Sequence, residues 1–476
     1  MSLSPSADQK PHIDELKRMG RRLLLWWAIT TALAVAALAF GLASRGTGFF
    51  RSFQGPADAS LVEVKFLVFV LAWLWLGLGL ALTLVPRLVA RHAAFLVVWF
   101  LLGLGYLNVV RGPHKVEHKD FSNYFTAAVH LRAGQPLADD PFQQYLYPPL
   151  LATLIEPLVP FGLGPASWLF RFGNYAALLL FAILLYAALQ RLGADRLVAA
   201  VLVLLGLSFN VPIADTLAAQ QINLHVANLI LLGLLLFPRH VALSAAAVAL
   251  GAHLKVYPVL LVLPFILLRQ WRWCAWFVAT SLGVVVATSA LNSFDYYAQF
   301  LGQLAGLQEY GIRNASVAAL LHNTAQFTGV SLGAIERPLA TLLQLGCAIL
   351  VGWWGWRPAR EGLLMPAGER PERVAGSAIV VLSLVMLVVS PSIWPHHLVL
   401  ALLPALVLVL SVRRVPDAVL LAVAWLLVFL VPVHEVFPFA YLRLVGLMVF
   451  GFLFRGVAED AASGKPALVT ILRPAT

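Results

Sequence analysis

Long apolar runs separated by short polar segments dominate this chain. Runs such as 23–43, 65–85 and 166–189 approach the roughly 20 residues that an α-helix needs to cross about 30 Å of hydrocarbon. The runs are continuously apolar rather than alternating, which argues against the strands of a membrane β-barrel. The pattern therefore predicts an all-α polytopic membrane protein.

We expect about 14 transmembrane helices, several of them shorter than a full span. The predicted spans are 23–43, 64–85, 93–111, 166–189, 196–210, 217–237, 240–253, 256–269, 273–291, 336–356, 375–390, 396–411, 417–433 and 439–455. The short pair around Lys255 also fits a re-entrant hairpin, whose irregular backbone is tolerated where protein surrounds it.

Composition and charge support a membrane location. Hydrophobic residues make up 61% of the chain and charged residues only 12%, against roughly 25% charged in soluble domains. The net charge of +11 does not indicate a nucleic-acid partner, because the basic residues flank the predicted spans. The partners expected from this pattern are membrane lipids, and no nucleic acid.

The Lys and Arg positions also predict an orientation in the inner (plasma) membrane. With both termini in the cytoplasm, every predicted cytoplasmic segment contains at least one Lys or Arg, as the positive-inside rule requires. The outward-facing segments are then 112–165, 210–220, 253–257, 292–335 and 390–397.

The first outward segment contains two predicted amphipathic helices that lie on the membrane surface. One covers Asp120–Ala133 and places Phe121, Phe125 and Val129 on one face. The other covers 147–161 and begins at Pro148-Pro149, where proline is tolerated at a helix start.

Ionisable groups are costly at membrane depth, so each is a candidate for function. Asp120 is either a general base or the cap of the helix that it begins. Lys255 is either a cation for a phosphate group or a side chain that reaches the interface. His396 and His397 are either part of a site or packed at a helix start. Arg171 is a candidate of the same kind, with interface anchoring as its alternative.

Gln221 and Asn223 are polar residues inside an apolar stretch, where they either belong to the site or join two helices. One or two carboxylates among several cations suit a site that handles a phosphate and one hydroxyl proton. The chain has no Gly-rich phosphate loop, no HExxH and no paired CxxC. We expect no cofactor and no essential metal, because a lysine and histidines can take the place of the metal ion.

Four short motifs then resemble those of one family of membrane glycosyltransferases. The first contains Lys119-Asp120-Phe121, Tyr124, Gly134, Pro136 and Tyr145-Leu146-Tyr147-Pro148-Pro149-Leu150. The others are Gln220-Gln221-Ile222-Asn223, Leu254-Lys255-Val256-Tyr257-Pro258 and Ser390-Pro391-Ser392-Ile393-Trp394-Pro395-His396-His397. Together they resemble glycosyltransferase family 87, over roughly residues 93–455. In the last motif Ser392 and Ile393 are exchanged relative to the usual order, and Pro395 precedes the histidines.

The resemblance implies a GT-C fold with 12 helices in its core, a polyprenyl-phosphate sugar donor and an inverting reaction in which Asp120 is the base. It also implies an active site that faces outward. Donor binding is then expected at Lys255, His396, His397, Tyr257, Asn223, Gln221 and Arg171, and positioning of the acceptor or the loops at Tyr124, Tyr147 and Trp394.

The predicted organisation has three parts: an N-terminal segment with two extra helices (1–92), a glycosyltransferase membrane domain (93–455) and a cytoplasmic tail (456–476). The sugar is expected to be mannose, with arabinofuranose as the alternative, and the acceptor a lipid-anchored or glycan molecule of the cell envelope. A lipid-linked sugar flippase and a scaffold subunit are the non-enzymatic alternatives. A transporter would be expected to show inverted repeats and polar groups near the midplane, whereas these polar groups lie at one face.

Overall fold

The structure, a computed structural model, describes residues 51–52, 55–56, 120–137, 145–194, 196–207, 210–307, 309–311, 313–365, 368–412, 414–430 and 439–462. The predicted spans 23–43, 64–85 and 93–111 lie outside these residues. Apart from a two-residue antiparallel pair, β1 (Arg51–Ser52) with β2 (Gly55–Pro56), the described chain is helical.

The helices of the first half begin with α5 (Asp120–Arg132), α6 (Pro149–Ile155), η3 (Glu156–Phe161), α7 (Leu163–Arg191), α8 (Arg196–Leu207) and α9 (Val211–Ala219). They continue with α10 (Asn223–Leu236), α11 (Val241–Leu254), η4 (Tyr257–Val262), α12 (Leu263–Leu267), α13 (Trp271–Leu291) and α14 (Asp295–Gly306).

The second half contains α15 (Val317–Thr328), η5 (Gly333–Ile335), α16 (Glu336–Glu361), α17 (Arg370–Val389), η6 (Pro395–Ala401) and α18 (Leu402–Ser411). It ends with α19 (Val415–Trp425), the π-helical turn η7 (Leu426–Leu430), η8 (Phe439–Tyr441) and α20 (Leu442–Ala462).

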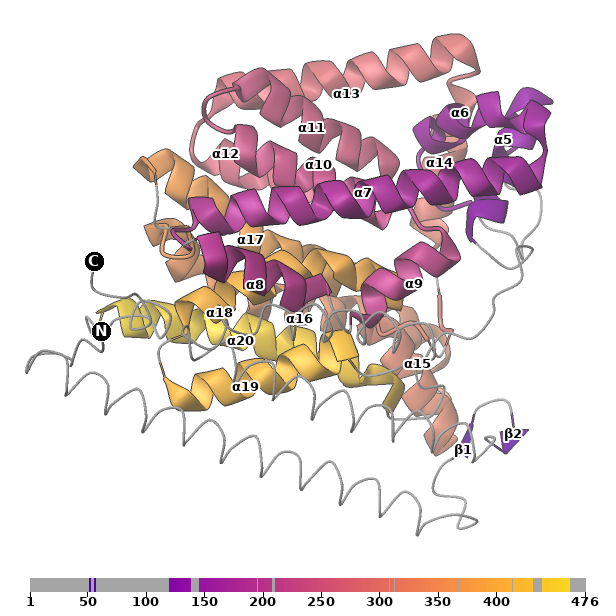
Figure 1. Cartoon of the computed structure of the whole chain (residues 1–476). Coiled ribbons are helices and arrows are strands. Elements are labelled where there is room, and N and C mark those ends of the chain that lie inside the picture. Colours follow the sequence, from indigo (N-terminus) through magenta and orange to yellow (C-terminus); the bar gives the residue numbers. More distant parts are fainter. Residues whose placement is uncertain are drawn as a thin grey trace, which may run out of the picture.

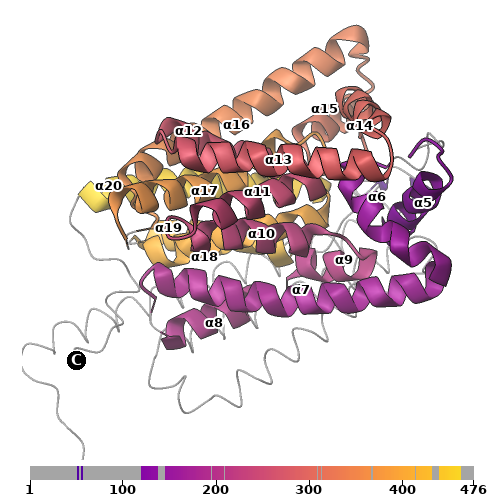
Figure 2. The ribbon, with the colours of Figure 1, turned by 90° about the horizontal axis from the view of Figure 1, so that it is seen from above.

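The long helices run side by side as a bundle, and the short helices α5, α6, α14 and α15 gather at one end of it (Figures 1 and 2). α10 packs between α7 and α11, and α16 packs against both α17 and α20. Large apolar side chains are exposed on the outside of the bundle, among them Phe172, Leu282 and Trp353. Such a surface suits lipid and not water.

Four described helices are long and apolar enough to cross a membrane: Leu163–Arg191, Trp271–Leu291, Gly333–Glu361 and Arg370–Val389. The bent pair Val198–Leu207 and Val211–Ala219 makes a fifth if it is counted as one span. A membrane protein is therefore supported, while the count of about 14 spans and the GT-C topology stay predictions.

Several predicted spans are broken helices. The predicted span 256–269 divides into η4 and α12, with Pro258 and Pro264 near the start of the two pieces, and 396–411 divides into η6 and α18. Proline removes a backbone donor and restricts its predecessor, which explains why these apolar runs do not form single helices.

One predicted boundary was wrong. The residues of the outward segment 210–220 form α9, which is capped by the side chain of Asn210. Gln220 then ends α9 in the left-handed conformation with φ 56°, so that a continuous span 217–237 is replaced by α10 starting at Asn223. A left-handed residue cannot continue a right-handed helix.

The buried face of α5 also differs from the predicted one. Phe121 is buried, but Val129 is exposed, and the residues that share the buried face with Phe121 are Tyr124, Ala128 and Leu131. Phe121 packs against Phe170 of α7, with ring centroids 4.8 Å apart. Docking on α7 thus decides which side of this helix is covered.

The contact between α16 and α17 offers a test of the packing. A Cβ atom at Gly355 would lie 2.7 Å from Val381 Cγ2, whereas one at Gly346 of the same helix would meet nothing within 4 Å. We expect Gly355→Ala to destabilise the fold by about 1–3 kcal/mol through overpacking. Gly346→Ala is the matched control and should cause no loss in thermal unfolding measured in lipid. Equal unfolding temperatures for the two variants would contradict this helix contact.

Candidate active site

The candidate site lies where α5, the turn before α6, the start of α10, the junction of α11 with η4, and η6 come together. These elements carry all four sequence motifs, and side-chain hydrogen bonds connect the first motif to the second and the third motif to the fourth. Direct side-chain contacts therefore join all four motifs.

Gln221 connects the predicted base to two tyrosines. Its Oε1 accepts hydrogen bonds from the hydroxyls of Tyr124 (2.7 Å) and Tyr147 (3.0 Å), and its Nε2 donates to Asp120 Oδ2. The left-handed turn at Gln220 allows the chain to place Gln221 here, between α9 and α10. Since phenol hydroxyls donate to the amide oxygen, the amide nitrogen must face the carboxylate.

The ionisation of this group follows from its burial. α5 is not among the candidate membrane spans. Burial raises the pKa of the Asp120 carboxyl above its ordinary 3.8, while the Gln221 hydrogen bond and the Lys255 charge lower it. Burial also raises the pKa of the Tyr124 and Tyr147 phenols, which keeps both as donors. A carboxylate with a raised pKa is a stronger proton acceptor, as general-base catalysis requires.

Asp120 is the first residue of α5, and its described hydrogen bond comes from Gln221 of a distant motif. Both roles of Asp120, base and cap, stay predictions that substitutions at this position test.

Lys255 occupies the junction between α11 and η4, where the helix ends with an extended residue. Its side chain is buried, and its Nζ lies 2.9 Å from Asn223 Oδ1 and 2.7 Å from His397 Nε2. It also lies 5.3 Å from the ring centroid of Tyr147 and 5.7 Å from that of Tyr257. These are cation–π distances.

Burial lowers the pKa of the Lys255 amine from 10.5 to about 7, while the charges of Asp120 and Glu309 raise it. With its side chain charged, Lys255 selects one tautomer of His397. An ammonium can only donate, so Nε2 of His397 must accept, and the ring proton sits on Nδ1. Nδ1–H then donates to Ser392 O at 3.0 Å. In this state Lys255 has only neutral partners, since no carboxylate of the described residues lies within ion-pair distance of Nζ.

Buried charges in proteins are normally paired, so an ammonium with neutral partners marks a place where an anion would be stabilised. The side-chain amide of Asn223 is a second group that could bind an anion here. Asn223 is fully buried, and its Nδ2 has no hydrogen-bond partner in the part of the chain that the structure describes. Its Oδ1 accepts from Lys255 and from the Tyr257 hydroxyl at 3.2 Å. The amide therefore offers its donor to a ligand beside the ammonium.

Two further predicted residues lie near this centre with looser contacts. The His396 ring packs edge-on against His397, with centroids 4.6 Å apart, and its carbonyl accepts from Thr216 at 3.3 Å. Trp394 lies parallel to His396 at 6.5 Å between ring centroids. Arg171 is not brought into the cluster, because it stacks on the exposed Trp168 at 4.5 Å, as an interface anchor does.

The structure adds Glu309 to the site, a residue that the sequence motifs do not include. Its Oε2 accepts from Trp394 Nε1 at 2.8 Å and from Ser392 Oγ. The only signal in the sequence is its place in the outward segment 292–335, since its partners lie more than 80 residues away.

No three His, Cys, Asp or Glu side chains among the described residues are grouped so as to hold a metal ion. The expectation that the site needs no metal is untested and stays a prediction.

The fold and site define a helical membrane protein with a buried polar centre at one end of its bundle. The model of glycosyltransferase family 87 matches residues 145–391, more than half of the 476 residues. The chain belongs to glycosyltransferase family 87, and it is a glycosyltransferase. No curated protein matches the chain.

The matched region is narrower than the resemblance seen in the motifs. Tyr147, Gln221, Asn223, Lys255 and Tyr257 lie inside it, whereas Asp120, Tyr124, Trp394, His396 and His397 lie outside. The hydrogen bonds from Gln221 to Asp120 and from Lys255 to His397 join the two groups. The candidate site therefore extends beyond the matched residues on both sides.

Proposed function

We propose that this protein transfers a sugar, mannose in the first instance, from a polyprenyl-phosphate donor to a hydroxyl group of a cell-envelope glycolipid or glycan, with inversion. The observation that carries the proposal is the buried Lys255 side chain, which has no carboxylate within ion-pair distance among the described residues, although the charges of Asp120 and Glu309 act on it. Tyr147 links Lys255 to Asp120, because its ring lies beside Lys255 Nζ and its hydroxyl contacts the Gln221 amide that holds Asp120.

In the proposed reaction the acceptor oxygen attacks the anomeric carbon, and the bond from that carbon to the phosphate oxygen breaks. Asp120 takes the hydroxyl proton, and the donor phosphodiester leaves as a phosphomonoester with one more negative charge. Lys255, Asn223 Nδ2 and the histidines are placed to stabilise that added charge, which is greatest in the transition state. The total charge is conserved, because the carboxylate becomes a neutral acid.

The direct test supplies purified protein in lipid with radiolabelled polyprenyl-phosphate mannose and a membrane-lipid extract. Label moved to an extracted lipid or glycan would support the proposal, and the anomeric configuration of the product would report inversion. Label from polyprenyl-phosphate arabinofuranose moving instead would replace mannose. Absence of transfer from both donors, with donor carried across the membrane of proteoliposomes, would replace the enzyme by a transporter.

The site is proposed to face outward, and labelling tests this. Gln135 and Glu361 are both exposed. In a variant without Cys274 and Cys347, Gln135→Cys should react with an impermeant thiol reagent added outside intact cells, while Glu361→Cys should react only after permeabilisation. The reverse pattern would place the site in the cytoplasm.

A further inference from the structure

Glu309 is a second carboxylate at the site, and among the described residues it has no cation within ion-pair distance. Both of its side-chain hydrogen bonds in the described structure come from neutral donors, Trp394 Nε1 and Ser392 Oγ, and both reach Oε2. Its Oε1 receives no donor among the described residues. Oε2 is thus held in place by two donors, while Oε1 remains available to accept hydrogen bonds from a ligand.

The backbone around Glu309 is tied to the histidine motif. Asn314 Nδ2 donates to Glu309 O at 2.6 Å and to Pro391 O at 3.1 Å, and Asn314 Oδ1 accepts from Ile393 N at 2.7 Å. Ala315 N donates to Ile393 O at 2.8 Å. The segment that carries Glu309 and the motif that carries Trp394 therefore form one connected unit.

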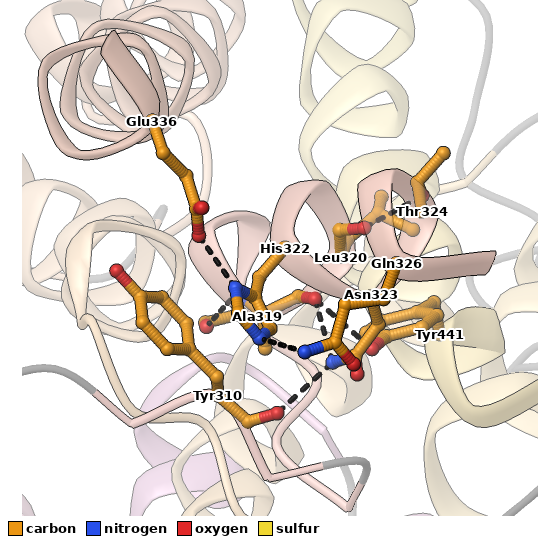
Figure 3. Close-up of polar contacts among 10 residues, drawn as sticks. Tyr310, Ala319, Leu320, His322, Asn323, Thr324, Gln326, Glu336 and Tyr441 are labelled. Carbon is orange, nitrogen blue, oxygen red and sulfur yellow. Dashed lines mark hydrogen bonds and ion pairs between the residues drawn. The ribbon is translucent and has the colours of Figure 1, made fainter. Parts of the chain in front are cut away.

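A cluster behind Glu309 holds the next residue of the chain. The Tyr310 ring stacks on His322, with centroids 4.1 Å apart, and Tyr310 O accepts from Asn323 Nδ2 at 3.0 Å (Figure 3). The His322 ring lies between Glu336 Oε1 (2.6 Å) and Gln326 Nε2 (2.8 Å). Side-chain amides therefore hold the carbonyls of both Glu309 and Tyr310, and such a fixed backbone is the preorganisation that a binding group needs.

Glu309 also lies close enough to the proposed base to affect it. Its negative charge adds to the burial effect that raises the pKa of the Asp120 carboxyl. A second anion beside Asp120 would repel a phosphate, so a phosphate is a poor ligand for Glu309. Hydroxyl groups are suitable ligands, because they donate hydrogen bonds to a carboxylate without adding charge.

We propose that Glu309 and Trp394 form a subsite for a neutral, hydroxyl-bearing sugar ring, that of the acceptor. Glu309 Oε1 accepts from ring hydroxyls, and the half-buried Trp394 offers apolar surface to the ring carbons. This inference rests on the proposed function, since the ring must lie beside Asp120. The sugar of the donor also carries ring hydroxyls, so it is the alternative occupant of this subsite.

Equilibrium binding to the full chain in lipid nanodiscs tests the subsite without requiring turnover. The probes are tritiated octyl mannoside below its micelle concentration, polyprenyl-phosphate mannose and sugar-free polyprenyl phosphate. Glu309→Gln keeps the shape and an oxygen for Trp394, but it removes the charge. We expect it to weaken octyl mannoside binding about tenfold or more, with polyprenyl phosphate binding unchanged. Asp295→Asn, an exposed carboxylate at the start of α14, is the matched control.

The outcomes separate the possibilities. Loss of affinity for polyprenyl-phosphate mannose alone would support the subsite and assign the ring to the donor. The subsite would be rejected if Glu309→Gln bound every probe as tightly as Asp295→Asn does. It would also be rejected if the wild-type protein bound neither sugar-bearing probe. If Glu309→Gln does not fold, Glu309→Asp retains the charge at a shorter reach and should show the same selective loss. Wild-type protein that binds the probes but transfers no sugar would reject the proposed function alone.

Discussion

Asp120→Asn is expected to reduce sugar transfer by roughly 10² or more while leaving expression and thermal stability nearly unchanged. Asparagine caps a helix about as well as aspartate, so a capping role survives this change. The proton acceptor does not survive it. The Gln221 contact also becomes amide to amide, and its Nε2 can still donate to the Asn oxygen. Transfer measured with radiolabelled donor, alongside thermal unfolding in lipid, checks this result.

Asp120→Ala supplies the comparison. If Asp120 is only a cap, Asn should be nearly silent, whereas Ala should cost about 1 kcal/mol of stability, with activity falling along with it. If Asp120 is the base, the wild-type pH profile gives a further readout. Transfer should decline as pH falls through a pKa above 3.8, because burial raises the pKa of this carboxyl and a base must be ionised. Near-normal transfer by Asp120→Asn would reject the mechanism.

The sequence predicted the long helices well because they follow from the apolar pattern alone. The predicted spans 166–189 and 273–291 correspond to α7 and α13 with small differences at their ends. Two helices were also predicted in the segment 112–165, and α5 begins at Asp120 and α6 at Pro149, although the second helix divides into α6 and η3. Their position on the membrane surface stays a prediction. In these segments local preference and tertiary structure agree.

Tertiary packing determines two features that the apolar pattern of the sequence does not predict. The buried face of α5 depends on its contact with Phe170, and the break at Gln220 serves to bring Gln221 to Asp120. Neither is visible in local periodicity. Polar side chains in an apolar stretch did mark the site, because burying them is costly without partners. The partners themselves, Glu309 above all, come from segments far away in the chain.

Lys255 shows how sequence and structure contribute differently. Its position among apolar residues singled it out as a candidate cation, but the sequence cannot reveal whether a carboxylate neutralises it. The structure places an amide, an imidazole and two aromatic rings against it, all neutral, while the charges of Asp120 and Glu309 act on it from beyond ion-pair distance. A buried ammonium in such surroundings opposes the stability of the free protein, and a bound phosphate would relieve it.

Lys255→Met should therefore separate stability from function. Methionine has a similar volume and no charge, so the ligand-free variant should unfold at the same temperature as the wild type or a few degrees higher. Its affinity for sugar-free polyprenyl phosphate should fall about tenfold or more, and transfer should fall by about 10²–10³, as when a donor to a developing oxyanion is removed. Thermal unfolding, equilibrium binding and transfer by one preparation measure all three.

Arg132→Ala is the matched control, because Arg132 is an exposed cation at the end of α5 that pairs with Glu156 at 3.5 Å. It should leave donor binding and transfer near wild type. Lys255→Arg retains the charge in a larger group and should recover donor binding in part, with less recovery of transfer, since position matters more for the reaction than for attraction. A Lys255→Met protein that is clearly destabilised yet binds polyprenyl phosphate normally would make Lys255 a structural residue, and the anion would then have to bind elsewhere.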